Sequence, residues 1–355
     1  MEGTAERRLL IVRLSSMGDV IHALPAAVAL RKALPEATIG WVIEERWSEL
    51  LCARDYPLDG PLSEQKPSVN RVHCVRTKAW RRSPLAPATW ADLRSGLGEV
   101  RRARYDAAID FQGSIRSAVI ARWSGAPEIV GFAAPRETPA RWFYKKKVQT
   151  KGAHVIEQNL ALAAALTGTT EAPTAILPRD PASEVWCDRY LEQTKPKPLV
   201  LLNPGAGWGA KQWPAERYGA VARELARDGY TLLINHGPGE EGLAQAVTST
   251  GDGAVRPVSC SLGELIALIR RASLFIGGDT GPLHLAAALQ VPVVAIFGPT
   301  DPARNGPFGT KSIVLRSPES ITSHSRRAEA EPGLVRITGD QVLTAARELL
   351  LRSTA

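Results

Sequence analysis

The sequence predicts an α/β protein made of two doubly wound domains. Its 355 residues exceed the ~100–200 residues of one typical domain. Short runs rich in Val, Ile and Leu alternate with helical patterns, which indicates βαβ units and parallel sheets. The alternation stops in a proline-dotted region near residues 170–197 and then starts again. Two domains of the same architecture, joined in that region, account for this repetition.

The N-terminal half supplies five predicted strands and two clear helices. The strands lie at residues 9–14, 38–43, 71–76, 107–111 and 128–132. Apolar positions recur at helical spacing over residues 23–34 and 90–103. Strands separated by helices favour a parallel sheet, so we expect an N-terminal Rossmann-like domain over residues 1–170.

The C-terminal half repeats this order more regularly. Its predicted strands lie at residues 199–203, 231–235, 254–257, 274–276 and 293–297. Its predicted helices lie at residues 216–228, 240–249, 262–272 and 283–289. We expect a linker region at 171–197 and a second Rossmann-like domain over residues 198–335.

The last segment, residues 336–355, is predicted to contain a closing helix. Val342, Ala345, Leu349 and Leu350 fall on one helical face within it. An apolar face needs a packing partner, and the N-terminal domain is a candidate for that partner.

Composition excludes several classes of protein. No stretch reaches the ~20 apolar residues of a membrane-spanning helix. The first residues, MEGTAERR, lack the apolar core of a signal peptide, so a cytoplasmic location is expected. The four cysteines and six histidines are scattered without a CxxC pair. We therefore predict no metal site and no disulfides.

The net charge of +8 suits an anionic partner. Basic side chains cluster with tryptophans in RTKAWRR, residues 76–82, and in PRETPARWFYKKK, residues 135–147. A phosphorylated acceptor at an anionic membrane face fits such clusters. Nucleic acid is the competing partner, because basic stretches with aromatics also describe strand-binding surfaces. Solvated helix faces are the third interpretation.

The stretch IGGDTGPLHLAAALQVPVVAIFGPTDP begins where a strand ends and a helix starts. Free backbone amides at a helix start bind pyrophosphate well. Asp279 and Thr280 stand at this turn, and His284 lies a few residues into the helix. The structural alternatives are that Asp279 and Thr280 only cap the helix and that His284 packs against the sheet.

Two further loops follow strands in the same half. NPGAGWGAKQWP, residues 203–214, combines glycines with Lys211, a candidate phosphate ligand or else a solvated lysine. In HGPGEEGLAQA, Glu240 is placed to accept hydrogen bonds from ribose hydroxyls or simply to favour a helix start. GxxxxGK[ST] is absent from the sequence, so the phosphate site differs from that of P-loop enzymes.

The N-terminal half carries RLSSMGDVIHALPA, residues 13–26, directly after its first strand. A turn alone does not require an acid, so we predict that Asp19 is a catalytic base facing the cleft between the domains. The alternative is that Asp19 caps the helix, a contribution of about 1 kcal/mol. In DFQGSIRS, Gln112 and Ser114 end another strand and either bind sugar or form a turn.

Taken together, these motifs resemble the lipopolysaccharide heptosyltransferases of glycosyltransferase family 9. SSMGDVIHALPA, NPGAGWGAKQWP, GPGEE and GGDTGPLHLAAAL with FGPTDP occur in the family's order from about residue 8 to 310. The SSMGDV form is most similar to the heptosyltransferase I branch. The resemblance implies a GT-B fold, two Rossmann-like domains facing across a cleft. It also implies inverting transfer of L-glycero-D-manno-heptose from ADP-heptose, with no cofactor and no metal.

The resemblance further implies an acceptor and roles for particular residues. The acceptor is the inner 3-deoxy-D-manno-octulosonate (Kdo) of Kdo-lipid A, at the cytoplasmic face of the inner membrane, and no nucleic acid is expected. Asp19 takes the role of the base. The donor residues are Gly207, Lys211, Glu240, Cys260, Asp279, Thr280, Gly281 and His284. The acceptor residues are Gly18, Arg76, Lys78, Gln112 and Arg136.

This chain departs from the family pattern at three places. Ala206 and Gly207 stand where some members offer threonine hydroxyls to the phosphates. Cys260 falls near an adenine-packing position often held by methionine. Residues 317–333 look peculiar to this chain. These departures leave the second phosphate contact and the selectivity for adenine open.

Three rival functions remain at this level. The first is transfer of a later heptose or of another sugar. The second is a sugar-nucleotide epimerase or hydrolase built on two such domains. The third, which rests on charge alone, is a nucleic-acid-binding protein.

Overall fold

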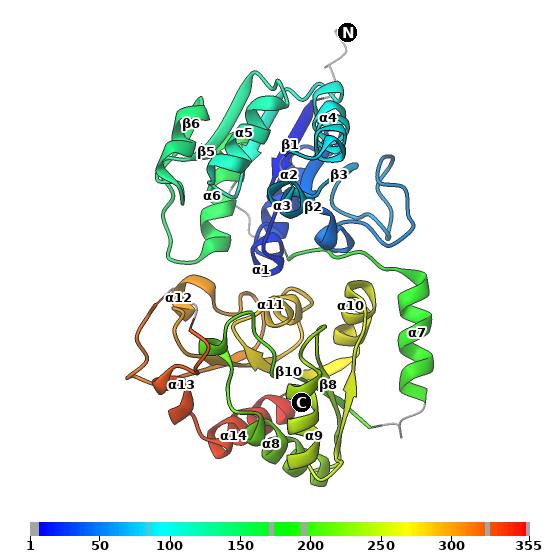
Figure 1. Cartoon of the computed structure of the whole chain (residues 1–355), viewed down its shortest axis with the longest axis vertical. Coiled ribbons are helices and arrows are strands. Elements are labelled where there is room, and N and C mark those ends of the chain that lie inside the picture. Colours follow the sequence, from blue (N-terminus) through cyan, green and yellow to red (C-terminus); the bar gives the residue numbers. More distant parts are fainter. Residues whose placement is uncertain (1–6, 84, 170–173, 193–196, 324–326, 353–355) are drawn as a thin grey trace. The chain divides into compact units, whose positions relative to one another are not determined.

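The chain folds into two compact units, Met1–Asp180 and Pro181–Ala355. The computed structural model describes residues 7–83, 85–169, 174–192, 197–323 and 327–352. Each unit contains one six-stranded sheet with helices around it (Figure 1). The boundary between the units falls within the predicted linker region. Parts of that region, residues 171–173 and 193–196, lie outside the described residues.

The first unit is built on a parallel sheet with the strand order β3-β2-β1-β4-β5-β6. Its strands are β1 (Arg8–Val12), β2 (Thr38–Glu44), β3 (Arg71–Val75), β4 (Ala107–Asp110), β5 (Glu128–Phe132) and β6 (Lys146–Val148). Its α-helices are α1 (Met17–Ile21), α2 (Leu24–Ala33), α3 (Thr77–Arg82), α4 (Pro87–Arg102), α5 (Ile115–Trp123) and α6 (Val155–Thr167). Two 3₁₀ helices, η1 (Glu45–Leu50) and η2 (Thr138–Phe143), complete it.

The second unit repeats the architecture with the parallel strand order β12-β11-β10-β7-β8-β9. Its strands are β7 (Leu199–Asn203), β8 (Thr231–Asn235), β9 (Val255–Val258), β10 (Ala272–Gly278), β11 (Val293–Phe297) and β12 (Ser312–Arg316). Its helices are α7 (Pro181–Glu192), η3 (Gly209–Lys211), α8 (Ala215–Arg227), α9 (Glu241–Thr250), α10 (Leu262–Arg270), α11 (Gly281–Ala288), α12 (Pro302–Asn305), α13 (Pro332–Arg336) and α14 (Gly339–Leu351).

Both strand orders contain a switch point. In the first unit the chain leaves β1 toward β2 on one side and reaches β4 on the other. In the second unit β7 and β10 hold the corresponding positions. Ligands of such folds bind outside the carboxyl ends of the strands at the switch point. The loops that follow β1, β4, β7 and β10 are therefore the expected binding loops.

All ten predicted strands are present. Two edge strands, β6 in the first sheet and β12 in the second, were not predicted. β6 has only three residues, two of them lysines, so it lacks the apolar run that marks a buried strand. β12 does contain a short apolar run, residues 313–315, which was overlooked. The predicted linker region also contains α7, which has Glu184 in its first turn and Arg189 in its last turn.

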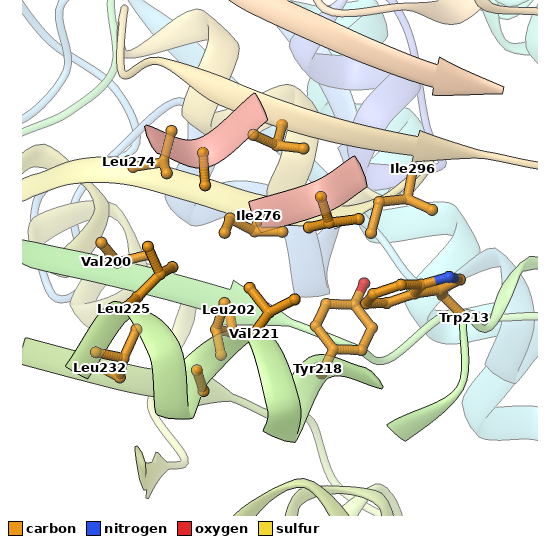
Figure 2. Packing of buried hydrophobic residues seen from close by; sticks show 14 of the residues in the cluster. Val200, Leu202, Trp213, Tyr218, Val221, Leu225, Leu232, Leu274, Ile276 and Ile296 are labelled. Carbon is orange, nitrogen blue, oxygen red and sulfur yellow. The ribbon is translucent and has the colours of Figure 1, made fainter. Parts of the chain in front are cut away.

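The C-terminal helix α14 packs inside the second unit, whereas the sequence suggested the N-terminal domain as a candidate partner. Its residues Val342, Ala345, Leu349 and Leu350 are buried together with Val200 and other core residues. Figure 2 shows side chains of this cluster; those it labels lie on β7, β8, β10, β11 and α8, and Trp213 lies in the loop before α8. The indole of Trp213 also donates a hydrogen bond of 2.9 Å to the carbonyl of Ile337, just before α14. The apolar face of α14 was predicted correctly, but its partner was not.

The first unit buries its own apolar cluster. Leu10, Val12 and Val42 from the central strands join Val100 from α4 and Ala118 from α5. This cluster holds α4 and α5 against the sheet and thereby places the loop after β4. Within the described ranges, no helix has the length and apolar character needed to cross a bilayer.

Candidate functional site

Asp19 lies in the first turn of α1, directly after the loop that leaves β1. One of its carboxylate oxygens, Oδ2, accepts hydrogen bonds from the backbone N–H of Ser16 at 2.9 Å and from the Ser16 hydroxyl at 2.8 Å. The other, Oδ1, lies 2.6 Å from the guanidinium of Arg13. Ser16 is the N-cap residue and Asp19 the third helical residue, so Asp19 contributes to capping without being the cap itself. Its side chain remains 34% exposed, which leaves it accessible to a ligand.

The electrostatic balance at Asp19 favours the ionised form. Burial raises the pKa of its carboxyl, but the Arg13 guanidinium and the hydrogen bonds from Ser16 outweigh burial and lower the pKa to about 2. The sequence left the sign of this shift open. Asp19 is therefore a carboxylate at neutral pH and can accept a proton only from a group that becomes strongly acidic.

Gln112 supports the same loop. It follows β4, and its Oε1 accepts hydrogen bonds from the backbone N–H groups of Leu14 at 2.8 Å and Ser15 at 3.4 Å. Its Nε2 donates to the Ser114 hydroxyl at 3.1 Å. Gln112 and Ser114 are both buried. The structure thus places Gln112 beside the loop of Asp19 and uses its amide to position that loop.

The buried carboxyl of Asp110 organises the loop after β4. It accepts hydrogen bonds from the backbone N–H of Gln112 at 2.8 Å, the Ser117 hydroxyl at 2.9 Å and the Tyr144 hydroxyl at 2.6 Å. The Gly113 N–H donates a fourth hydrogen bond to it at 3.1 Å. Burial raises the pKa of Asp110, and the four hydrogen bonds act in the opposite direction without cancelling that rise. The sequence analysis did not single out Asp110 or Tyr144. The strand-ending aspartate in DFQGS was the only available signal.

The predicted acceptor cations occupy the carboxyl edge of the same sheet. Arg76 follows β3, is exposed, and forms a bidentate ion pair with Asp92 at 2.6 and 3.2 Å. Lys78 and Arg136 are exposed as well. A Cβ atom on Gly113 would lie 3.1 Å from the Arg136 backbone nitrogen, so Arg136 is anchored beside the loop of Gln112.

Gly18, the remaining predicted acceptor residue, is buried within α1 next to Asp19. Its carbonyl accepts the backbone hydrogen bond of His22 at 2.9 Å.

In the second unit, the structure brings Lys211, Asp279 and His284 together. The Lys211 ammonium lies 2.5 Å from Asp279 Oδ2, and His284 Nε2 lies 3.0 Å from Asp279 Oδ1. Lys211 also lies over the Trp208 ring, with its nitrogen 4.6 Å from the ring centroid. The three side chains come from the loops after β7 and β10 and from α11, which meet at the switch point. His284 is buried against Asp279 and so orients that carboxylate.

Burial raises the pKa of Asp279, but the His284 hydrogen bond and charge and the Lys211 ammonium together hold it well below the usual range. The carboxylate is therefore ionised, and Lys211 carries the compensating charge beside it. An anion such as a phosphate would be attracted by Lys211 and repelled by Asp279. A hydroxyl donor would be attracted by Asp279. Lys211 therefore marks a subsite for an anion, and Asp279 marks a neighbouring subsite for a hydroxyl group.

Thr280 and Gly281 form the start of α11. Thr280 is the N-cap residue, but its hydroxyl donates to the Gly278 carbonyl at 3.3 Å and caps no helical N–H. The capping alternative for this hydroxyl is therefore wrong. A Cβ on Gly278 would lie 3.2 Å from the Lys211 carbonyl, so glycine there lets the two loops approach. The N-terminus of α11 with its free amides lies beside Lys211.

Glu240 lies at the N-cap position of α9, where its Oε2 accepts the Gly237 N–H at 2.8 Å. A Cβ on Gly205 would lie 2.3 Å from both carboxylate oxygens of Glu240. The acid is thus held against the glycine loop that leads to Lys211. A Cβ on Gly207, in contrast, would meet open space.

Two asparagines that the sequence analysis missed link these loops. Asn235 Nδ2 donates to Asn203 Oδ1 at 2.7 Å, and Asn203 Nδ2 donates to the Gly205 carbonyl at 3.1 Å. The Cys260 thiol lies 3.7 Å from Asn235 Oδ1. Burial and the nearby Glu264 raise the pKa of Cys260 to about 12, so it remains a neutral thiol. Asn203 and Asn235 end β7 and β8, which is the one sequence signal that could have marked them.

Residues 317–333 connect two of these loops. Ala210 N donates to the Arg327 carbonyl at 3.1 Å, and Glu331 N donates to the Ala210 carbonyl at 3.2 Å. A Cβ on Gly209 would lie 1.7 Å from the Ala328 carbonyl oxygen. Ser323 N reaches the Pro299 carbonyl after β11 at 2.8 Å. The segment therefore braces the loop of Lys211 from outside; its residues 324–326 lie outside the described part.

The described residues contain no group of three or more His, Cys, Asp or Glu side chains that could hold a metal ion. All four cysteines carry free thiols.

The model of glycosyltransferase family 9 (heptosyltransferase) matches residues 94–334. The chain belongs to glycosyltransferase family 9. Lipopolysaccharide heptosyltransferase 1 of Pseudomonas aeruginosa is 31% identical over 320 residues, which cover 87% of this chain and 84% of that protein. Lipopolysaccharide heptosyltransferase 1 of Escherichia coli K12 is 28% identical over 91% of this chain and 98% of its own.

Solved structures of this glycosyltransferase family share the fold. A family 9 glycosyl transferase from Veillonella parvula has a TM-score of 0.82 and 25% identity over 98% of both chains. The E. coli heptosyltransferase WaaC, solved with ADP, has a TM-score of 0.76 and 26% identity over 96% of this chain and 99% of its own. These likenesses and the two parallel sheets confirm the predicted fold class, GT-B with two Rossmann-like domains. Family membership makes the chain a glycosyltransferase, which decides against the epimerase and hydrolase alternatives.

Proposed function

We propose that this glycosyltransferase moves L-glycero-D-manno-heptose from ADP-heptose to the inner Kdo of Kdo-lipid A, in lipopolysaccharide core biosynthesis. The observation that carries the proposal is the meeting of Lys211, Asp279 and His284 at the switch point of the second sheet. The relatives named lipopolysaccharide heptosyltransferase 1 support the reaction. A solved relative with ADP-2-deoxy-2-fluoro heptose supports the donor.

The second unit would bind the donor through residues of opposite charge. Lys211 and the amides at Gly281 would hold the diphosphate, and Asp279 would accept hydrogen bonds from the heptose hydroxyls. Glu240 would accept hydrogen bonds from the ribose hydroxyls. Cys260 and Asn235 would lie near the adenine ring. Because negative charge grows on the departing diphosphate, Lys211 would stabilise the transition state more than the bound donor. We assign no metal and no cofactor to this step.

The first unit would supply the base. In the reaction, a hydroxyl oxygen of the acceptor bonds to the anomeric carbon while the bond from that carbon to the ADP oxygen breaks. The hydroxyl proton passes to Asp19, ADP leaves with the electron pair, and the anomeric configuration inverts. Because the pKa of Asp19 is lowered to about 2, proton transfer would come late, once the new bond has made the hydroxyl strongly acidic. Arg76, Lys78 and Arg136 would contact the acidic acceptor.

The test of this proposal is mass spectrometry of the product from ADP-heptose and Kdo-lipid A. Wild-type protein should add one heptose. In Asp19→Asn the rate of transfer should fall by orders of magnitude, while the variant should still bind ADP. Asp59→Asn is the matched control, because Asp59 pairs with Arg71 on the surface of the same unit. Transfer by Asp19→Asn at the wild-type rate would remove Asp19 from the mechanism. Absence of product with the wild-type protein would refute the acceptor assignment.

Transfer of a later heptose is the second candidate. Its support is the similarity to lipopolysaccharide heptosyltransferase 2 of E. coli K12, 27% identical over 98% of this chain. The same assay with Kdo-lipid A that already carries one heptose separates the two reactions. We also propose that the enzyme acts at the cytoplasmic face of the inner membrane, where a lipid-linked acceptor would be available.

A further inference from the structure

Helix α5 of the first unit is apolar on both faces. Its inner face buries Ala118, Ile120 and Ala121 against the sheet. A surface helix usually turns charged and polar side chains outward. On α5, however, Ile115, Val119 and Trp123 are all exposed, at a spacing of four residues. These three side chains form one apolar stripe along the outer side of the helix.

The neighbouring element η2 carries a further exposed apolar side chain. The two elements pack against each other, and Ile115 N donates to Glu137, directly before η2, at 2.8 Å. Trp142 of η2 is 78% exposed, an unusual position for the largest apolar side chain. Exposed apolar groups that lie together on one face mark an interaction surface, whereas scattered ones do not.

The charged residues within α5 and η2 are cationic, and the acid at their junction, Glu137, accepts the Ile115 N–H. The sequences of α5 and η2, IRSAVIARW and TPARWF, contain three arginines and no acid. Arg116, Arg122 and Arg141 are all exposed. The Arg116 guanidinium is anchored by donating to the Thr77 hydroxyl at 2.6 Å, and Arg101 of α4 reaches the Trp123 carbonyl at 3.4 Å. We call Ile115, Val119, Trp123, Trp142, Arg116, Arg122 and Arg141 the α5 face.

We propose that the α5 face docks the enzyme on an anionic phospholipid surface. Tryptophans prefer the headgroup region of a bilayer, where one end of the ring is apolar and the other is wet. Arginines flanking them are attracted to anionic headgroups, so the two signals needed for stable peripheral binding occur on one face. A protein partner with acidic side chains would pair with the same arginines. Such a partner does not account for the two exposed tryptophans, whereas a bilayer interface accounts for both.

The position of the α5 face suits a lipid-linked acceptor, and this part of the inference rests on the proposed function. α5 begins at Ile115, three residues after Gln112, which holds the loop of Asp19. An acceptor whose lipid chains remain in the bilayer would present its sugar close to the N-terminal end of the stripe. Docking through α5 would therefore bring the acceptor sugar and the base to the same edge of the first sheet.

Co-sedimentation of the full chain with vesicles tests the inference. Vesicles of phosphatidylglycerol and phosphatidylcholine in equal parts should retain the wild-type protein at low salt, and vesicles of phosphatidylcholine alone should retain far less. The double variant Val119→Asp/Arg122→Gln should reduce partitioning at least about tenfold, because it removes one cation and one apolar contact and adds an anion. The single variant Trp142→Ser should reduce it about tenfold through lost apolar area alone.

The control is the same pair of changes on another helix. Val185 and Arg189 are exposed on α7 of the second unit, so Val185→Asp/Arg189→Gln alters net charge equally. This variant should change partitioning less than about twofold, since screening weakens distant charges. Equal losses in the α5 and α7 variants would overturn the inference. So would wild-type protein that binds oligonucleotides or itself through the α5 face while ignoring anionic vesicles.

Activity assays keep this inference separate from the proposed function. With an acceptor sugar that lacks lipid chains, the α5 double variant should transfer heptose at the wild-type kcat/KM. With the acceptor embedded in vesicles, its rate should fall in parallel with binding. Wild-type protein that docks as expected but transfers no heptose would refute the reaction and leave the docking surface standing. Wild-type transfer to both acceptors by a variant that no longer binds vesicles would refute the role of docking.

Discussion

At the residue scale, the ion pair between Arg13 and Asp19 is the main feature that the sequence did not reveal. Arg13 is buried, and its guanidinium contacts both Asp19 and the carbonyl of Phe111 at the end of the neighbouring strand. The arginine thereby joins the loop after β1 to the loop after β4. It also makes Asp19 a weak base with a fixed orientation, which suits a base that acts late.

The ion pair predicts a pH-dependent stability difference. The folded-state pKa of Asp19, about 2, lies below its ordinary value of 3.8, so its contribution is present above pH 4 and is lost as the pH falls toward 2. We expect Asp19→Asn to lower the free energy of unfolding by about 1–2 kcal/mol at pH 7, allowing for the exposed third of the side chain. Urea denaturation should show this difference shrinking below pH 4. A difference that grows on acidification would contradict the assigned pair.

Gly205 offers a second prediction at this scale. A methyl group there would displace the Glu240 carboxylate, because the two would be only 2.3 Å apart. Glu240 has a flexible side chain, so Gly205→Ala should fold normally and lose less than about 1 kcal/mol of stability. Its affinity for ADP should nevertheless fall about tenfold, as for Glu240→Gln, through the lost ribose hydrogen bonds. Isothermal titration with ADP measures this, and Gly242→Ala, with open space around its Cβ, is the control.

At the element scale, helix α14 shows how a correct local pattern can leave the partner undetermined. The spacing of its apolar residues predicts which face is buried but contains no information about which surface covers it. The structure answers this with α8 and the strands of the second sheet. The hydrogen bond from Trp213 to Ile337 fixes the turn that directs α14 there. The second unit is therefore complete only with its C-terminal helix.

Two leucines of α14 test this assignment. Leu349 is buried in the core of the second unit, and Leu351 is 71% exposed at the end of the same helix. Leu349→Ala should lower the free energy of unfolding by about 2–5 kcal/mol, because it leaves a cavity. Leu351→Ala should change it by less than about 0.5 kcal/mol. Chemical denaturation of both variants provides the comparison, and equal effects would show that the core assignment is wrong.

At the scale of the whole molecule, the proposed roles divide between the two units. The base and the cationic residues belong to the first unit, and Lys211, Glu240 and Asp279 belong to the second. Asp19 follows β1, and Lys211 and Asp279 follow β7 and β10, which are strands that flank the switch points. Glu240 and the cationic residues follow other strands of the same sheets. The same architectural rule therefore generates two chemically different sites, one anchored by an arginine–aspartate pair and one by a lysine–aspartate pair.

This division predicts that kinetic defects separate by unit. Lys211→Met should weaken ADP binding by about tenfold or more, since it removes the cation beside the diphosphate and leaves Asp279 without its ion pair. Asp19→Asn should leave ADP affinity within about twofold and reduce kcat. Equilibrium titration with ADP, combined with steady-state rates, distinguishes the two. An ADP-binding defect in Asp19→Asn as large as that in Lys211→Met would contradict the division.

Much of the fold and part of the site followed from the sequence. Ten strands and the repeated α/β pattern were predicted, because buried strands and their glycine-rich ends leave strong local signals. Lys211 and Asp279 were each named as donor residues, but only the structure shows that they meet. The edge strand β6 was missed since its lysines carry no such local signal, whereas β12 was missed despite a short apolar run. Gln112 was expected to face a ligand, yet its amide holds the loop of Asp19, a partner 97–98 residues away in the chain.

The sequence by itself determined ten strands, the duplicated architecture and the residue types at each strand end. These depend on interactions between residues that are near in the chain. Only the tertiary structure decided the sign of the Asp19 pKa shift, the partner of α14, the bracing of the Lys211 loop by residues 327–331 and the outward apolar stripe of α5. Each of these depends on which distant residues meet, and burial and charge act through space, not along the chain.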